Sequence, residues 1–473
     1  MRKRISTILR YPVGMLLFIT AAAASSRGQT VLSFGLFLFL CFFEAAVLYS
    51  ERKALLDLRL LLTVSWLGGI SLSCLKLSHL QSVWGIRMWV SVFLFYFSAL
   101  LVNDLISGAF RRAEEISPEP RGLALSGTPE QYRKKLMSCI LVIFAAGFLS
   151  FAAECIVFRG ELPILSDKPH AYTAFHITGI HYFIVSMMFV PVLSVLYLFS
   201  GKTTVREKLV LSALSGCIFL IYVLMLSKLQ ILFTAALPAM TALLLQRRFK
   251  TRTLALFFLG VFLVFAAGVI LLMSMRHYPE GYLEKIFQFR DSKTPAAFQY
   301  VYTYIVNNFE NLNLLTENLQ HYSFGIRQLF PLFALTGAKF LPPVASLLSV
   351  EQYLTIEELT TLTVLYDAYG DFGVTGTLLF GVLFGAFTGY AEALLRKRNT
   401  AAVLLYVQLA VYAALAFFTT WFSNPTTWFW FAVTVFIVMR LSADGDGFKE
   451  CLRRTWEAFL PGRLREKRKE KHI

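Results

Sequence analysis

Stretches of about 20 mostly apolar residues recur along the chain, and each is long enough to cross a bilayer as a helix. Only 16% of the 473 residues are charged and 57% are hydrophobic, too little polar surface for a soluble domain of this length. This composition excludes a soluble enzyme, a nucleic-acid-binding module and a fibrous protein. It predicts an all-α polytopic integral membrane protein with about twelve transmembrane helices, near 11–26, 30–50, 54–75, 82–105, 136–158, 178–199, 209–228, 230–246, 253–274, 373–395, 401–422 and 425–441.

One apolar stretch, 209–246, is too long for a single span. Ser227, Lys228 and Gln230 interrupt it near its middle. We therefore expect two helices joined as a hairpin with almost no loop.

The distribution of Lys and Arg predicts which connections face the cytoplasm, because cytoplasmic loops of membrane proteins are enriched in both residues. With the N-terminus inside, every short basic connection falls on one side of the membrane, and both termini are cytoplasmic. An alternative is that 1–26, with its basic start, apolar run and Ala/Ser-rich end, is a cleaved signal peptide, which would leave eleven spans.

The basic tail Arg463–Lys471 allows two interpretations. It could bind RNA, but a basic run beside a membrane span is more often held by anionic lipid on the cytoplasmic face. We expect contact with the lipid bilayer and no nucleic-acid partner.

These signals divide the chain into six parts. They are the first four transmembrane helices (1–109), a cytoplasmic loop (110–135), helices five to nine with an outer loop at 159–177 (136–274), a long extracytoplasmic loop between helices nine and ten (275–372), helices ten to twelve (373–441) and a basic cytoplasmic tail (442–473).

The long loop is too large to be a connection without structure of its own, so we expect it to contain helices and to carry function. Amphipathic pieces at 281–289, 296–315 and 324–348 suit short helices that lie on or dip into the outer leaflet.

Several cations stand at helix ends predicted to face outward, where the positive-inside bias disfavours them. Arg159 follows the fifth span, Arg276 and His277 follow the ninth, and Arg327 lies in the long loop. Lys228 lies in the predicted hairpin. Each has a plain explanation alone, as a chance placement or a snorkelling side chain. Together they suit an anionic, lipid-borne ligand, since the guanidinium fork of arginine matches phosphate oxygens.

Two carboxylates lead into the tenth span. Asp367 and Asp371 are four residues apart and would share one helix face, with Tyr366 beside them as a substrate-binding candidate. A carboxylate at the membrane boundary could act as general base on a sugar hydroxyl, and helix capping explains each of them equally well. The glycines that follow predict a close helix-packing face at Gly376, Gly381, Gly385 and Gly389.

Signatures of soluble enzymes are missing, because the sequence has no phosphate loop, dinucleotide-binding glycine pattern, zinc-protease motif or nucleophile elbow. His170, His176 and His181 do not have the spacing of a zinc site, and the six cysteines form no CxxC pair. We expect no metal, no cofactor and no disulfide framework.

Four short segments resemble the Wzy-type O-antigen/oligosaccharide repeat-unit polymerases. One is Thr361–Arg396, with Leu-Tyr-x-x-Tyr-Gly-Asp-Phe-Gly at 365–373. The others are Gly160–Ser166, Ser227-Lys228 in the hairpin and Tyr322–Pro331 in the long loop. The resemblance covers about 136–396 and the overall topology. The family often has arginine where this chain has Lys228.

This resemblance implies a metal-independent glycosyltransferase of GT-C-like fold at the outer face of the bacterial cytoplasmic membrane. Its substrates would be oligosaccharides on undecaprenyl diphosphate, with a flippase and a chain-length regulator as partners. Arg159, Lys228, Arg276 and Arg327 would offset the charge of the diphosphate leaving group. Asp367 or Asp371 would act as the base or hold the acceptor.

Two alternatives stay open. A lipid-linked oligosaccharide flippase also has about twelve spans, but a transporter needs charged residues that face a cavity in the membrane. This sequence has few, of which Glu44 and Asp104 are the clearest. An O-antigen ligase-like transferase would use a lipid A-core or a protein as acceptor.

Overall fold

The structure is a computed structural model that describes residues 2–113, 123–125, 127–166, 174–246, 281–291, 293–349, 351–357, 359–443 and 448–460. Regular structure in these ranges is entirely helical, apart from two isolated β-bridges. Eight helical segments of the described ranges are long and apolar enough to cross a membrane. The predicted class is confirmed: the chain is an all-α, multi-pass membrane protein.

These eight segments coincide with predicted spans. They are α2 (Thr30–Arg52), α4 (Ile86–Ala113), α5 (Pro129–Val157), α7 with α8 (His181–Ser186 and Phe189–Phe199), α9 (Val205–Leu224), α10 (Lys228–Leu245), α16 (Tyr366–Leu395) and α18 (Pro425–Ser442).

Three further predicted spans are helical but fall outside that set, namely α1 (Arg2–Ser26), α3 (Leu58–Cys74) and α17 (Thr400–Ala414). The span predicted at 253–274 lies outside the described residues. Twelve spans and a GT-C-like fold therefore stay predictions.

By internal contacts the chain divides into two compact units, which are described separately. The first contains Met1–Ala109, Glu280–Tyr390 and Leu409–Trp428. The second contains Phe110–Pro279, Ala391–Gln408 and Phe429–Ile473.

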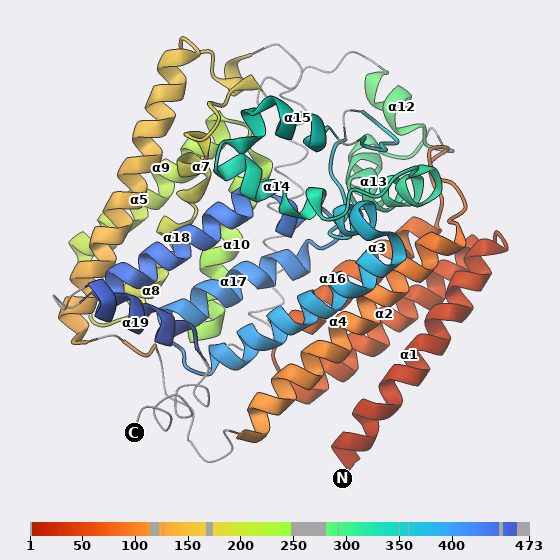
Figure 1. Cartoon of the computed structure of the whole chain (residues 1–473), viewed down its shortest axis with the longest axis horizontal. Helices are drawn as coiled ribbons and strands as arrows, with labels where there is room; N and C mark the ends of the chain where they lie inside the picture. The colour runs from red at the N-terminus through yellow and green to blue at the C-terminus, as the bar shows by residue number, and fades with distance from the viewer. Residues whose placement is uncertain are drawn as a thin grey trace. The chain divides into compact units, whose positions relative to one another are not determined.

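In the first unit, helices α1, α2 and α3 pack in succession, as Figure 1 shows in red and orange. Helix α16 packs on α4 through the predicted glycine face. A Cβ atom on Gly381 would lie 2.9 Å from the carbonyl oxygen of Phe95, and one on Gly385 would lie 2.4 Å from that of Ala99. Only glycine permits this approach of two backbones. The prediction is confirmed for Gly381, Gly385 and Gly389, whose Cβ atoms would all meet α4, and it is wrong for Gly376, whose Cβ would lie 2.0 Å from the Ala368 carbonyl oxygen of α16 itself.

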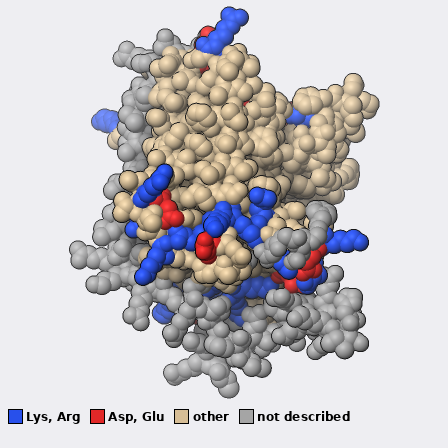
Figure 2. Space-filling model, turned by 90° about the vertical axis from the view of Figure 1, so that its left-hand side faces the viewer, with Lys and Arg blue, Asp and Glu red and all other residues tan. Residues whose placement is uncertain are grey.

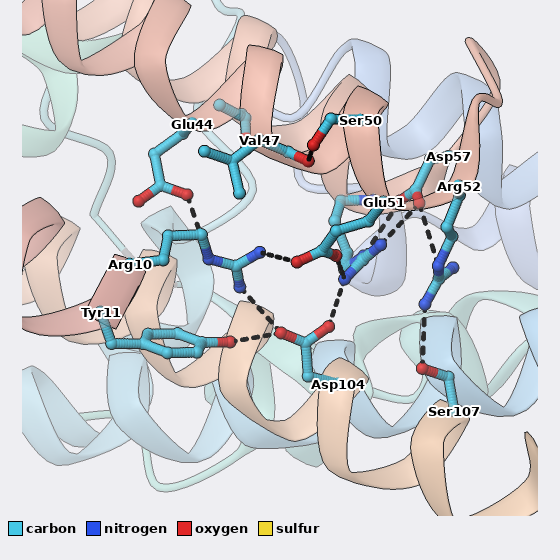
Figure 3. A network of polar contacts seen from close by, with 12 residues as sticks. Arg10, Tyr11, Glu44, Val47, Ser50, Glu51, Arg52, Asp57, Asp104 and Ser107 are labelled. Carbon is cyan, nitrogen blue, oxygen red and sulfur yellow. Dashed lines mark hydrogen bonds and ion pairs between the residues drawn. The ribbon is translucent and has the colours of Figure 1, made fainter. Parts of the chain in front are cut away.

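A network of buried charges ties one end of α1, α2, α3 and α4 together (Figure 3). Arg10 of α1 contacts Glu44 of α2 at 3.3 Å and Asp104 of α4 at 2.8 Å. Arg59 of α3 bonds to Asp57 at 2.8 Å and also reaches Asp104. The two intramembrane carboxylates singled out from the sequence are thus ion-paired, as burial in a membrane requires. This arrangement explains them as structural ties between helices.

The long loop contributes helices to the first unit, as predicted. They are α12 (Tyr282–Phe287), α13 (Ala296–Asn318), α14 (Ile326–Leu335), η2 (Ala338–Phe340) and α15 (Pro342–Leu348).

Helix α13 differs from the surface-lying helix that its amphipathic pattern suggested. It packs on α3, and most of its side chains are buried, including Asn311 and Glu310. These polar groups are satisfied inside the unit, because Glu310 pairs with Lys76 at 2.8 Å and Asn311 accepts the Thr355 backbone N–H at 2.8 Å. Polar residues here stabilise neighbouring loops rather than face water.

The second unit contains the predicted hairpin. Helix α9 ends at Leu224 and α10 begins at Lys228, after a turn in which Leu226 has a positive φ of 52°. The unit also contains α5, α7, α8, η1 (Pro163–Leu165), most of α18 and α19 (Phe448–Phe459).

Helices α5 and α9 present an apolar outer face. Figure 2 shows a broad surface with few charged atoms next to a band where blue and red side chains gather. Exposed leucines, valines and phenylalanines on both helices account for such a surface, which suits contact with lipid tails; examples are Leu141, Phe148, Leu149, Leu209, Phe219 and Leu220.

Several basic connections predicted to share a side of the membrane contact one another in the second unit. Arg133 donates to Glu207 at 2.9 Å, Ala124 N–H to the Arg398 carbonyl at 3.0 Å, and Lys397 Nζ to the Glu457 carbonyl at 2.8 Å. These residues come from separate basic segments, which is the arrangement expected if these connections share one side of the membrane; which side that is stays a prediction.

Several helix ends differ from the apolar boundaries. Helix α1 begins at Arg2 instead of about 11, and α17 ends at Ala414 instead of about 422. Helix α4 continues to Ala113, α5 begins at Pro129 instead of about 136, and α16 begins at Tyr366 instead of 373. Polar residues extend helices beyond the hydrocarbon core, where hydropathy does not detect them. In α5 the start is set by Thr128, whose hydroxyl accepts the Gln131 N–H, followed by Pro129 in the first turn.

Candidate functional site

A buried arginine in the first turn of α14 is the centre of the candidate site. The Arg327 residue is only 6% exposed. Its Nε donates to Ser323 Oγ at 3.1 Å and its Nη2 donates to the Glu351 backbone carbonyl at 3.0 Å. The guanidinium also lies 5.9 Å from the ring centroid of Tyr366. Its contacts are therefore with neutral acceptors and an aromatic face.

No carboxylate oxygen of the described residues forms an ion pair with this guanidinium. Asp371 is joined to it through Ser323, and Asp367 interacts with it electrostatically, so part of the cost of burying the cation is offset within the fold. The planar fork also suits two oxygens of one phosphate group. These features make Arg327 a candidate for anion binding.

Asp371 fixes the backbone beneath Arg327. Its side chain is fully buried, and its Oδ1 accepts from Ser323 Oγ at 2.8 Å and from the Arg327 backbone N–H at 3.1 Å. Its Oδ2 accepts the Gln328 backbone N–H at 2.9 Å. Gly325, which precedes α14, has no side chain that could cap the helix. Asp371 supplies the cap from another helix, and an anion at a helix N-terminus is favourable.

This geometry defines the role of Asp371 more closely than its sequence could. Both carboxylate oxygens are engaged with donors of α14 and its preceding turn, and the residue has no exposed surface. With no exposed surface, the carboxylate is not accessible to a substrate hydroxyl in this arrangement. The arrangement favours helix capping and positioning of Arg327 over the role of general base.

Two glycines let α16 approach this turn. The backbone carbonyl of Gly370 accepts the Ser323 N–H at 3.1 Å, and that of Asp371 accepts the Phe324 N–H at 3.2 Å. The helix is then interrupted at Gly373, with φ 60° and ψ −144°, a conformation essentially restricted to glycine.

Two other predicted residues lie in the same turn of α16. Asp367 is half-buried and accepts a hydrogen bond from Ser423 Oγ of η3 (Trp421–Ser423), the element on which α14 also packs. The buried Tyr366 hydroxyl accepts the Tyr353 N–H at 2.7 Å and donates to its carbonyl at 3.2 Å. Arg327, Tyr366, Asp367 and Asp371 are thus brought together at the junction of α14 and α16.

The remaining predicted site residues belong to the second unit or lie outside the described residues. Arg159 and Lys228 belong to the second unit. Helices α5 and α9 begin at the same end of this unit, where Arg133 contacts Glu207. Arg159 follows the last residue of α5, and Lys228 follows the last turn of α9. Arg159 is exposed in the left-handed turn after α5, with φ 53°, and Lys228 is half-buried at the first residue of α10. Arg276 and His277 lie outside the described residues.

Sequence reasoning missed Ser323, Ser423 and the Glu351 carbonyl as parts of this site. Ser323 lies inside the Tyr322–Pro331 segment that was noted for its resemblance, which was the only available signal. Ser423 and Glu351 are ordinary residues in sequence, and only their contacts reveal them. Within the described ranges, no group of three or more His, Cys, Asp or Glu side chains could hold a metal ion.

No known protein family, no curated protein and no solved structure matches this chain.

Proposed function

We propose that this protein is a membrane glycosyltransferase that polymerises undecaprenyl-diphosphate-linked oligosaccharide repeat units into a surface polysaccharide such as O-antigen, capsule or exopolysaccharide. It acts at the outer face of the bacterial cytoplasmic membrane, with both termini in the cytoplasm. A flippase supplies its substrate and a chain-length regulator acts beside it. The proposal rests on the Wzy-like segments, the multi-pass architecture and the chemistry around Arg327.

Arg327 is the single observation that carries the proposal. It is a buried cation whose guanidinium hydrogen bonds go to a hydroxyl and a backbone carbonyl, in a segment of the chain that resembles the long loop of the polymerases. A lipid diphosphate is an anion that arrives through the membrane, so an enzyme that uses it as donor needs no nucleotide-binding domain. The guanidinium would hold this group and offset the charge that develops on it.

In the proposed reaction a hydroxyl of the incoming unit attacks the anomeric carbon of the growing chain. A new glycosidic C–O bond forms, the bond from that carbon to the diphosphate oxygen breaks, and its electron pair stays on the lipid diphosphate. Arg327 stabilises this leaving group, while Asp371 holds the turn that presents it. Arg159 and Lys228 are further candidates for phosphate contacts.

The test replaces Arg327 in a strain deleted for the chromosomal gene and examines its surface polysaccharide on gels. The deletion should leave single repeat units. Arg327→Gln should behave like the deletion, because an amide carries no charge. Arg327→Lys should retain only short chains, because an ammonium cannot serve Ser323 and the Glu351 carbonyl together.

Arg290→Gln is the matched control, since Arg290 is an exposed arginine of the same loop. It should leave polymer length unchanged. Polymer that accumulates on the lipid carrier in the deletion strain would instead indicate a ligase, and repeat units stranded inside the cell would indicate a flippase.

A further inference from the structure

A cavity of about 710 Å³ lies in the second unit, at the end where α5 and α9 begin and α8 ends. All of its lining residues belong to this unit. The volume is within the range of small-ligand sites, roughly 300–1,000 Å³. Three basic and two acidic side chains line the cavity, so its net charge is positive and favours an anion.

Arg133 ties α5 to the α8–α9 connection at this cavity. Its Nη1 donates to the Lys202 carbonyl, and its Nη2 donates to Tyr197 Oη at 3.1 Å and to Glu207 Oε1 at 2.9 Å. Glu207 also accepts the Thr204 backbone N–H at 2.7 Å. The charges of Arg133 and Glu207 therefore offset each other within the fold, while Nε of Arg133 is buried and has no hydrogen-bond partner among the described residues.

Two lysines of the cavity are held more weakly. Lys202 is exposed, and its ammonium forms no hydrogen bond or ion pair with the described residues. Lys134 pairs with Glu130 at 3.0 Å, but the two side chains are 77% and 79% exposed. Such a surface pair contributes at most about 1 kcal/mol, so a bound anion can compete for Lys134.

One side of the cavity is apolar and continues onto an apolar helix surface. Met137 lines the cavity, and Leu141, one turn later on the same face of α5, is 48% exposed. On α9, Val210 follows Glu207 by three residues on the same face and is 40% exposed. An anion that also carries apolar chains matches both parts of this surface, whereas inorganic phosphate matches only the basic part.

We propose that this cavity binds the phosphate headgroup of an anionic glycerophospholipid, whose acyl chains lie against the apolar faces of α5 and α9. Lys134 and Lys202 hold the phosphate oxygens. Basic pockets between transmembrane helices on the cytoplasmic side bind anionic lipid headgroups, and this end of the unit is the one predicted to face the cytoplasm. The site is independent of the proposed polymerisation, because lipid binding needs no saccharide.

Native mass spectrometry of the full chain in a neutral detergent tests this, since a bound lipid is identified by its mass. The probes are phosphatidylglycerol and phosphatidylcholine with identical oleoyl chains, and inorganic phosphate. The natural chain should bind phosphatidylglycerol about 10-fold or more tightly than phosphatidylcholine, because only the first has a net negative headgroup. Millimolar inorganic phosphate should not displace it.

A double variant removes the two lysine charges. Lys134→Gln with Lys202→Gln should weaken phosphatidylglycerol binding about 10-fold or more and leave the melting temperature without lipid unchanged, since both side chains are exposed. Arg206→Gln with Lys208→Gln is the matched control, because both residues are exposed at the start of α9 and neither lines the cavity. It should change this affinity less than about threefold.

Two single variants separate charge from shape. Glu130→Gln should strengthen phosphatidylglycerol binding by up to about fivefold, because Lys134 loses its competing partner. Gly201→Phe should abolish binding with every charge intact, because its ring would occupy the cavity. A Cβ atom on Gly201 would meet only Arg133 within 4 Å, at the ordinary contact distance of 3.9 Å, so the backbone can accept a side chain there.

Three results would overturn the proposal. Equal affinity for the two lipids would mean that the cavity does not select an anion. Equal losses in the two double variants would mean that the basic surface as a whole, and not the cavity, attracts the lipid. Displacement of the lipid by millimolar inorganic phosphate would assign the cavity to a free anion instead.

Discussion

A Cβ atom on Gly370 would lie 2.5 Å from Nε of Arg327. This is closer than any real pair of such atoms, so the guanidinium would have to leave its bonds to Ser323 and Glu351. The absence of a side chain at Gly370 is therefore part of how the arginine is held.

We expect Gly370→Ala to abolish long polymer without preventing membrane insertion, because it displaces the candidate anion-binding group. Gly35→Ala is the control, since a Cβ there meets nothing within 4 Å. That variant should be neutral or stabilised by up to about 1 kcal/mol through helix propensity. Polysaccharide gels and thermal unfolding in detergent measure both effects. If Gly370→Ala gave polysaccharide of wild-type length on gels, the close contact of this glycine with Arg327 would not matter for function.

Asp371→Asn should harm the protein more than Asp367→Asn. In the first variant an amide nitrogen replaces one of two oxygens that accept backbone N–H groups of α14, which costs about 1–3 kcal/mol. Asp367 accepts from the Ser423 hydroxyl, and an amide oxygen can still accept this bond. Polymer length and melting temperature should therefore both fall for Asp371→Asn and change little for Asp367→Asn. Equal behaviour of the two would contradict the capping role.

Arg10→Met should destabilise the first unit by about 3–5 kcal/mol, because Glu44 and Asp104 would lose a buried counter-charge. Lys134→Met is the comparison, since Lys134 is 77% exposed and forms a surface pair with Glu130. It should change stability by less than about 0.5 kcal/mol. Protein yield and the thermal unfolding of the purified Arg10→Met and Lys134→Met variants measure the difference in stability. Similar values for both would mean that the network in Figure 3 contributes little.

Cysteines at Ser349 and Arg206 test the proposed orientation. Both positions are exposed, the first in the long loop and the second at the basic end of α9. In intact cells or spheroplasts, a membrane-impermeant thiol reagent should label Ser349→Cys and not Arg206→Cys, which should react only after lysis. The natural chain provides the background from its six cysteines. The reverse pattern would invert the topology and place Arg327 on the cytoplasmic side.

Apolar segments of membrane length predicted the class of the protein and the approximate position of each described span. Residues adjacent in sequence also predicted the position of a turn and of a helix-packing face, because both features depend on neighbouring residues of one segment. The polar interruption at Ser227 and Lys228 marked the α9–α10 turn, and the glycine spacing marked the face of α16 that packs on α4. The four candidate residues Arg327, Tyr366, Asp367 and Asp371 were also chosen from sequence.

What those residues do was decided by tertiary structure. Asp367 and Asp371 are both carboxylates in one turn, yet one accepts from Ser423 and the other caps α14, a difference that arises from contacts 40 or more positions away along the chain. The cavity beside Arg133 depends likewise on where the α8–α9 connection meets α5. Hydropathy follows the cost of moving each residue into lipid, which is a property of that residue alone. Hydrogen bonding and burial depend on neighbours that only the folded chain supplies.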